Sequence, residues 1–114
     1  MKAEVLKGHL DALLLATLEG GAEYGYAIRE ALHSQSGGRF DLPTGTIYPA
    51  LYRLERGGLI SGRWMAAGER RKRRCYTLTP AGRRTLADQR VFWVEFSTAV
   101  TAVLSEERSC PAPV

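Results

Sequence analysis

Apolar residues recur with a helical period in four parts of the chain. The clearest case is the segment 45–57, whose apolar stripe consists of Ile47, Ala50, Leu51 and Leu54. Their spacing of i, i+3, i+4 and i+7 predicts a helix with one buried face. Pro49 has no N–H to donate, which a helix tolerates near its start because the first N–H groups have no intrahelical partner.

Three further helices are predicted from the same kind of pattern. The first covers residues 3–19 and carries a leucine stripe at Leu6, Leu10, Leu13, Leu14 and Leu18, which we interpret mainly as core. The second covers residues 23–34, where Gly25 costs roughly 1 kcal/mol relative to alanine and indicates close backbone approach or a frayed first turn. The last covers residues 80–104, with Thr79 as N-cap and Pro80 at the first helical position.

Two strands are predicted between the third and the last helix. They cover residues 59–65 and 70–78 and are joined by a loop at 66–69. In the second strand, Tyr76 and Leu78 are expected on one face, with Cys75 and Thr77 on the other. A hairpin that follows helix, loop and helix forms a wing. The predicted fold class is therefore mainly α with a small β-hairpin (α+β), a winged helix-turn-helix with a long C-terminal helix.

Length and composition indicate a single globular domain with no membrane segment. The 114 residues contain no apolar run near the ~20 residues of a membrane span, and the N-terminus lacks a signal-peptide core. We therefore expect a cytoplasmic location. Cys75 and Cys110 are in no metal-binding spacing, and two reduced thiols are favoured over a disulfide. The polar, proline-containing segment 105–114 is predicted to be a disordered tail.

Positive charge is concentrated in the middle of the chain. Residues 53–90 contain eleven Lys/Arg against three Asp/Glu, whereas 1–52 contain four against six and 91–114 one against three. This pattern indicates an anionic partner at one location. The densest run is Arg70, Arg71, Lys72, Arg73 and Arg74. Because phosphates would relieve the repulsion among these five cations and release counterions, nucleic-acid contact is favoured over a merely solvated run.

The solvent faces of the third and last helices suggest two different partners. Opposite the stripe of the third helix lie Tyr52 and Arg56, flanked by Tyr48 and Arg53, whose side chains can donate to phosphates and base edges. The last helix has a seam close to heptad spacing, formed by Leu86, Trp93, Phe96, Val100 and Val103. A second copy of the chain is the simplest partner for it. Trp93 beside Phe92 is interpreted first as dimer core and second as a stacking platform for a planar apolar ligand.

Catalytic and metal-binding signatures are absent from the sequence. His9 and His33 are too few and too far apart for a metal site. No glycine-rich phosphate loop occurs, and no nucleophile lies near a base in a recognisable signature. The sequence therefore predicts a protein that is not an enzyme and needs no cofactor.

Three sequence runs together resemble the PadR family of winged-helix transcriptional regulators. They are YGYAIREAL at 24–32, GTIYPALYRLERGGLI at 45–60 and RRKRRCYTLTPAG at 70–82. The resemblance is to the small subgroup with one C-terminal helix, and it implies a homodimer that binds operator DNA, usually as a repressor. It also implies a ligand pocket between subunits near Trp93. The chain departs from the family where two tyrosines often follow one another, because Cys75 precedes Tyr76.

The predicted function is a dimeric DNA-binding transcriptional repressor that reads an inverted repeat and is released by a small planar hydrophobic effector. The resemblance places Thr44, Gly45, Thr46 and Tyr48 against the DNA. The full predicted DNA-binding set is Tyr24, Thr44, Gly45, Thr46, Tyr48, Arg53, Arg70, Arg71, Lys72, Arg73 and Arg74. Residues 1–79 would form the DNA-binding domain and 80–104 the dimerisation helix.

Two alternatives stay open at this point. A winged-helix protein-interaction module without a DNA role should have an apolar or mixed patch at the wing and not five cations. An RNA-binding domain is permitted by the outward tyrosines, but a helix suited to a major groove favours duplex DNA.

Overall fold

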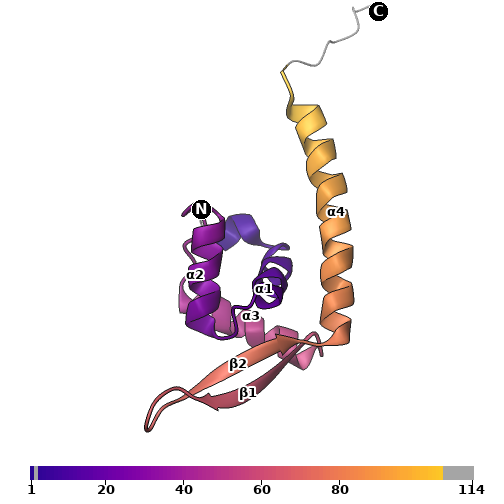
Figure 1. Ribbon diagram of the computed structural model, residues 1–114. Helices are drawn as coiled ribbons and strands as arrows, with labels where there is room; N and C mark the ends of the chain where they lie inside the picture. The colour runs from indigo at the N-terminus through magenta and orange to yellow at the C-terminus, as the bar shows by residue number, and fades with distance from the viewer. Residues whose placement is uncertain (2, 107–114) are drawn as a thin grey trace, which may run out of the picture.

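Four α-helices and one β-hairpin make up the fold of the described residues. The computed structural model describes Met1 and residues 3–106. The elements are a 3-10 turn η1 (Ala3–Leu6), α1 (Leu10–Glu19), α2 (Gly25–Gln35), α3 (Thr44–Arg56), β1 (Ile60–Ala66), β2 (Lys72–Leu78) and α4 (Pro80–Leu104). Figure 1 shows α1, α2 and α3 grouped together, the hairpin reaching away beneath them, and α4 rising alongside α1. The predicted winged helix-turn-helix is confirmed.

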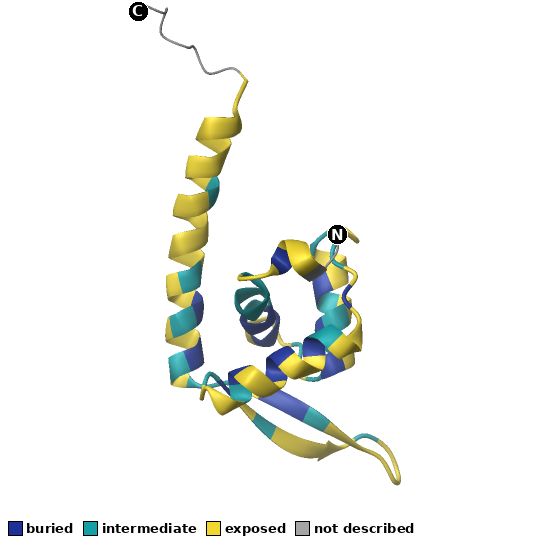
Figure 2. Ribbon diagram, turned by 180° about the vertical axis from the view of Figure 1, so that it is seen from behind, coloured by how far each residue is buried: buried dark blue, intermediate teal, exposed yellow. Residues whose placement is uncertain are grey.

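The core forms where the apolar stripes of the helices meet the base of the hairpin. The predicted stripe of α3 is confirmed, because Ile47, Ala50, Leu51 and Leu54 are its buried residues. They pack with Leu14, Leu15, Leu18, Ile28, Leu32, Ile60, Tyr76 and Leu86. Burying each Leu or Ile side chain contributes roughly 1.5–3 kcal/mol. Figure 2 shows these buried positions as dark blue bands on the inner sides of the elements.

The prediction of one continuous helix over residues 3–19 is wrong. The 3-10 turn ends at Leu6, and α1 begins only at Leu10. Between them Gly8 has φ of +88°, a left-handed conformation that glycine adopts readily and that interrupts a right-handed helix. Leu15 and Thr17 are also buried, outside the predicted stripe. The reason is that α1 lies between α2, α3, α4 and β2 and therefore buries more than one face.

The α2 helix begins two residues later than predicted, because Glu23 and Tyr24 pair with the hairpin. Tyr24 is extended and forms an isolated antiparallel bridge with Cys75. The Tyr76 backbone N–H donates to the Glu23 carbonyl at 2.7 Å. Close approach at Gly25 is confirmed: a Cβ added there would lie 2.5 Å from the Tyr48 ring.

The two strands pair antiparallel, with Ile60 opposite Leu78 at one end and Ala66 opposite Lys72 at the other. The second strand was predicted to begin at residue 70, but β2 begins at Lys72, so Arg70 and Arg71 lie in the turn before it. Cys75 and Tyr76, neighbours on opposite faces of β2, are both buried, so the hairpin is covered on both sides at this point. Within the described residues Cys75 forms no disulfide, and Cys110 lies outside them.

The last helix begins as predicted and then leaves the body of the protein. The Thr79 hydroxyl accepts from the Gly82 N–H at 3.0 Å, and Pro80 opens the helix. Gly82 and Leu86 are its buried residues, so its first turns complete the core of the winged domain. From Arg90 to Leu104 every residue except the half-buried Ser97 is exposed, as the yellow upper part of the helix shows (Figure 2). The predicted tail lies outside the described residues except for Ser105 and Glu106.

Within the described residues, no helix combines the length and the apolar character that a membrane span requires.

Candidate nucleic-acid interface

One side of α3 is free of the core and carries the residues predicted to read DNA. Thr44, Gly45 and Tyr48 are exposed at the start of the helix, and Thr46 is half-buried. Helix α3 starts at Thr44, so Pro49 lies inside it and cannot donate to the Gly45 carbonyl one turn earlier. A Cβ added at Gly45 would meet nothing within 4 Å. The start of α3 therefore presents backbone and hydroxyl groups to solvent.

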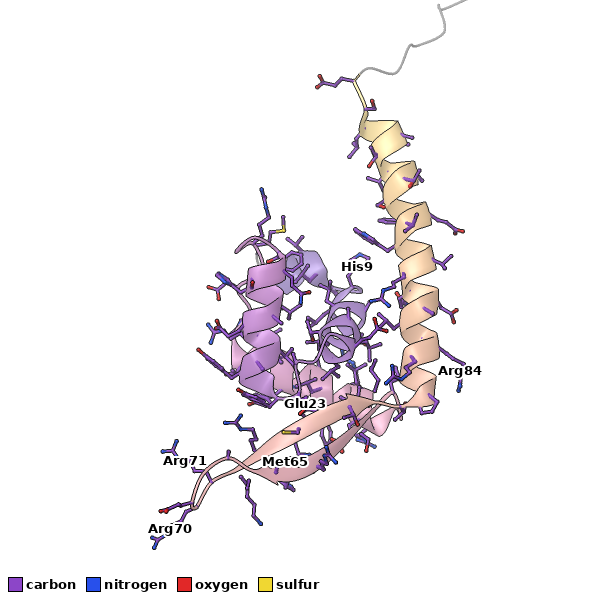
Figure 3. All side chains as sticks on the ribbon, in the orientation of Figure 1. His9, Glu23, Met65, Arg70, Arg71 and Arg84 are labelled. Atoms are coloured by element: carbon purple, nitrogen blue, oxygen red, sulfur yellow. The ribbon has the colours of Figure 1, made fainter. Side chains whose placement is uncertain are left out.

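The wing tip, which we define as Arg70, Arg71 and Lys72, is a group of three consecutive exposed cations. All three residues are exposed and none forms an ion pair with another described residue. Figure 3 shows Arg70 and Arg71 projecting from the end of the hairpin, away from the helices. Such side chains can reach phosphates without breaking an internal contact.

The other two cations of the run, Arg73 and Arg74 in β2, are held against the body of the protein. The Arg73 guanidinium carbon lies 3.9 Å from the centroid of the Tyr24 ring, within cation–π distance. Arg74 donates from Nη2 to Oε2 of Glu55 in α3 at 2.6 Å, and its guanidinium carbon lies 5.5 Å from the Trp64 ring. The run of five therefore divides into three free cations and two that join the wing to the body.

Arg53 lies at the edge of α3 that faces α1. Its guanidinium pairs with the carboxylate of Asp11, although both side chains are exposed. This contact ties α1 to α3, so a DNA contact by Arg53 would have to compete with an internal ion pair.

A groove of about 500 Å³ lies between α3 and the wing. Its lining residues are Tyr48, Tyr52, Glu55, Arg56, Trp64, Arg74 and Tyr76. Burial raises the pKa of the Tyr76 phenol and the Glu55 carboxylate raises it further, whereas Arg74 lowers it. The phenol consequently stays neutral at physiological pH. Glu55 and Trp64 were not predicted to be part of this site. Only the folded structure brings Glu55 of α3 to Arg74, and only the strand register brings Trp64 opposite Arg74.

The predicted dimer seam is only partly available in a single chain. Leu86 is 1% exposed in the chain's own core, so we remove it from the seam. Trp93, Phe96, Val100 and Val103 remain exposed. Phe92 and Phe96 stack with ring centroids 5.6 Å apart, and this apolar surface continues along the free part of α4.

Trp93 and Phe92, the predicted effector residues, both line one cavity of about 330 Å³. The cavity lies between α4 and the N-terminal part of the chain, with His9, Leu13 and Phe40 on the other side. The His9 ring meets Trp93 edge-on at 5.2 Å. His9 and Phe40 were not predicted here, since nothing in their local sequence indicates a position beside Trp93.

Metal chemistry finds no support in the described residues, where no group of three His, Cys, Asp or Glu side chains could hold an ion.

The helix-turn-helix, the wing with its cationic tip and the projecting helix define a winged-helix transcriptional regulator. The model of the transcriptional regulator PadR-like family matches residues 14–88, and the chain belongs to this family. The family comprises regulators and not enzymes.

Solved structures of proteins from several bacteria resemble the chain over most of its length. A transcriptional regulator from Clostridium thermocellum has a TM-score of 0.81 at 25% identity, covering 92% of this chain and 99% of that one. A PadR-like transcriptional regulator from Bacillus cereus has a TM-score of 0.77 at 30% identity, covering 91% and 99%. Bacillus subtilis PadR in complex with operator DNA has a TM-score of 0.65 at 25% identity, covering 93% of this chain but 52% of that one.

Proposed function

We propose that the protein is a dimeric repressor of transcription that binds an operator with inverted-repeat symmetry. The observation that carries the proposal is the joint exposure of the start of α3 and of the wing tip, both free of the core. The likeness to Bacillus subtilis PadR, whose structure was solved with operator DNA, supports the same assignment. In this arrangement α3 supplies base contacts in a major groove and the wing tip supplies phosphate contacts.

The experiment that tests DNA binding is selection of duplexes from a random pool, followed by affinity measurement over a range of salt concentrations. The plot of log K against log salt has a negative slope, and each lost phosphate contact reduces the magnitude of that slope by about 0.9. Arg70→Ala with Arg71→Ala should therefore weaken all duplexes alike and reduce the magnitude of the slope by about 2. Arg84→Ala is the matched control, because Arg84 is an exposed cation at the base of α4, away from the wing tip (Figure 3).

The same experiment tests the alternative of a protein-interaction module. Failure to select any duplex above background would contradict the proposed function and favour that alternative. Selected duplexes without dyad symmetry would contradict the inverted repeat alone. A two-fold dimer should select half-sites about one helical turn, roughly 34–36 Å, apart.

Dimerisation through α4 is supported by its exposed apolar surface. Trp93, Phe96, Val100 and Val103 are between 38% and 71% exposed in one chain, an arrangement that a second copy would cover. Sedimentation of the unaltered protein as a monomer at micromolar concentration would contradict this part of the proposal.

A second candidate function, release of DNA by a planar hydrophobic effector, is favoured by the cavity beside Trp93. The cavity of about 330 Å³ is large enough for a small aromatic ring system and is lined by Phe92, Trp93 and Phe40. An effector can release DNA only if it prefers the dimer geometry that does not fit the operator.

The test uses Trp93 fluorescence in a Trp64→Phe variant, titrated with a panel of planar aromatic compounds. Quenching at tens of micromolar, together with loss of duplex binding, supports the effector. If no compound quenches and Trp93→Ala only weakens the dimer, Trp93 is an interface residue and the effector hypothesis is wrong.

A further inference from the structure

We propose that Glu55 and Arg74 form a coupling pair that fixes the wing against the recognition helix α3. Arg74 is then a positioning residue and not a phosphate contact. Glu55, although an anion in the groove beside two DNA-contacting elements, promotes DNA binding. The inference rests on the proposed DNA-binding function and assigns roles within it.

The contact joins the two elements that would touch DNA. Glu55 lies in the last turn of α3 and Arg74 in the middle of the wing, and their N–O distance is 2.6 Å. The two side chains are only 27% and 29% exposed, whereas both partners of the Arg53–Asp11 pair are 46% or more exposed. A half-buried, charge-assisted hydrogen bond is stronger and less screened than a surface ion pair.

The guanidinium of Arg74 is enclosed on more than one side. A Cβ added at Gly62 would lie 2.8 Å from Nε of Arg74, so the planar group lies directly across the glycine. Trp64, the cross-strand partner of Arg74, borders it at 5.5 Å. Tyr76, two residues on along the same face, is buried beside the pair. The contacts with Gly62, Trp64 and Tyr76 direct the guanidinium toward Glu55 and shield it from solvent.

The outer part of the wing has few other contacts, because the pairing with Glu23 and Tyr24 holds β2 only at Cys75 and Tyr76. Between Arg63 and Arg73 every residue is exposed except the half-buried Ala67. A two-stranded hairpin is marginally stable by itself. Two arginine contacts therefore set its direction, Arg74 on the α3 side and Arg73 over Tyr24 on the α2 side. Loss of either contact lets the wing tip move relative to the start of α3.

Positioning and simple electrostatics make opposite predictions for Glu55. If charge alone mattered, Glu55→Gln would remove an anion from a phosphate-binding face and tighten DNA binding. If Glu55 holds Arg74, the same variant releases the wing and weakens binding. Glu69→Gln, which removes an exposed carboxylate from the wing turn, is the matched control.

The probe is a duplex selected by the unaltered protein, compared with a shuffled duplex of equal length. We expect Glu55→Gln to weaken binding of the selected duplex about tenfold, because a neutral amide oxygen holds the Arg74 guanidinium more weakly than a carboxylate does. The salt slope should be unchanged, and Glu69→Gln should bind as tightly as the unaltered protein or more tightly. Glu55→Gln binding as tightly as the unaltered protein, or more tightly, would overturn the inference.

Arg74 variants provide a second, independent readout. Arg74→Ala should reduce affinity for the selected duplex without changing the salt slope, whereas loss of a direct phosphate contact would reduce the magnitude of the slope by about 0.9. Arg74→Lys keeps the charge but not the planar fork, and should restore affinity only in part. Gly62→Ala should resemble Arg74→Lys, because the added methyl displaces the guanidinium. A drop in the magnitude of the slope for Arg74→Ala would overturn the positioning role.

The failure of this inference can be told from the failure of the proposed function. If the unaltered protein selects no duplex, both are overturned. If it selects a duplex and Glu55→Gln binds more tightly, only the coupling pair is overturned. Thermal unfolding of each variant shows whether the helices remain folded at the temperature of the binding measurement.

Discussion

Helices α3 and α4 have similar apolar patterns but differ in how much of their apolar stripe is buried. The stripe of α3 is buried entirely within the chain, with Ile47 and Leu51 at 0% exposure. The stripe of α4 is buried only at Leu86, and its continuation at Phe96 and Val100 is 43% and 38% exposed. Helical periodicity thus identifies a face that has to be covered, but not whether the same chain or another molecule covers it.

The exposed sides of the two helices differ in chemistry as well. On α3 the free side carries hydroxyl groups and cations, which suit phosphates and base edges. On α4 the free side carries aromatic and branched aliphatic side chains, which suit another apolar surface. These differences support the proposal that α3 meets DNA and α4 meets a second copy, and each part can be tested separately.

The largest effect is expected in the buried stripe of α3. Leu51→Ala should lower the free energy of unfolding by about 2–5 kcal/mol, because it leaves a cavity at a fully buried position. Chemical denaturation at two protein concentrations measures this loss. The loss should be the same at both concentrations, since the site lies within one chain. A loss that disappears at high concentration would show that the α3 stripe depends on the partner.

The next largest effect is expected in the free part of α4. Val100→Glu should weaken dimerisation about 100-fold, because an unpaired charge would be buried between copies. Sedimentation equilibrium measures the change. Val91→Glu is the matched control, since nine residues, or about 900° of helix rotation, place Val91 on the opposite side of α4. Equal weakening by both variants would contradict an interface on one face.

A smaller effect is expected at the start of α3. Tyr48→Phe keeps the ring against Gly25 but removes the hydroxyl group. We expect preference for a selected duplex over a shuffled one to fall about three- to tenfold, the contribution of one hydrogen bond. Competition binding measures the ratio, and sedimentation should be unchanged. An unchanged ratio would remove the Tyr48 hydroxyl from sequence reading.

The smallest effect is expected where α4 leaves the body. Arg90 donates to Glu19 of α1 at 2.9 Å and holds the pKa of that carboxyl below its ordinary value of 4.5. A lowered folded pKa contributes stability that is present above pH 4.5 and is lost as pH falls through the folded pKa. Glu19→Gln should therefore be slightly less stable than the unaltered protein at pH 7 and equal to it in strong acid. Because both side chains are exposed, 1 M salt should reduce the difference.

Sequence reasoning succeeded where short-range chemistry decides the structure. Three features are set by residues that lie only a few positions apart in the sequence. They are the stripe of α3, the cap formed by Thr79 and Pro80, and the alternation of faces along β2. The break at Gly8 was missed because the leucine stripe continues across it, and spacing alone contains no information on φ.

The candidate site was predictable in its residue types and less so in its contacts. The cationic run was visible in the sequence, but its division into free and held cations was not. That division depends on the hairpin register and on the pairing of β2 with Glu23 and Tyr24, which bring Arg74 to Glu55 and Arg73 to Tyr24. These partners lie 19 and 49 positions apart in the sequence. Leu86 was assigned to the dimer because its spacing from Trp93 fits a heptad, although the core of its own chain already buries it.

The buried thiol of Cys75 offers a chemical probe of the contact between the wing and the body of the protein. It lies beside the pairing of β2 with Glu23 and Tyr24, where the side chain is 6% exposed. An alkylating reagent can reach the sulfur only when this pairing opens, so in a Cys110→Ser background the labelling rate measures the frequency of opening. Labelling rates measured with and without DNA would show how often β2 separates from Glu23 and Tyr24 in each state.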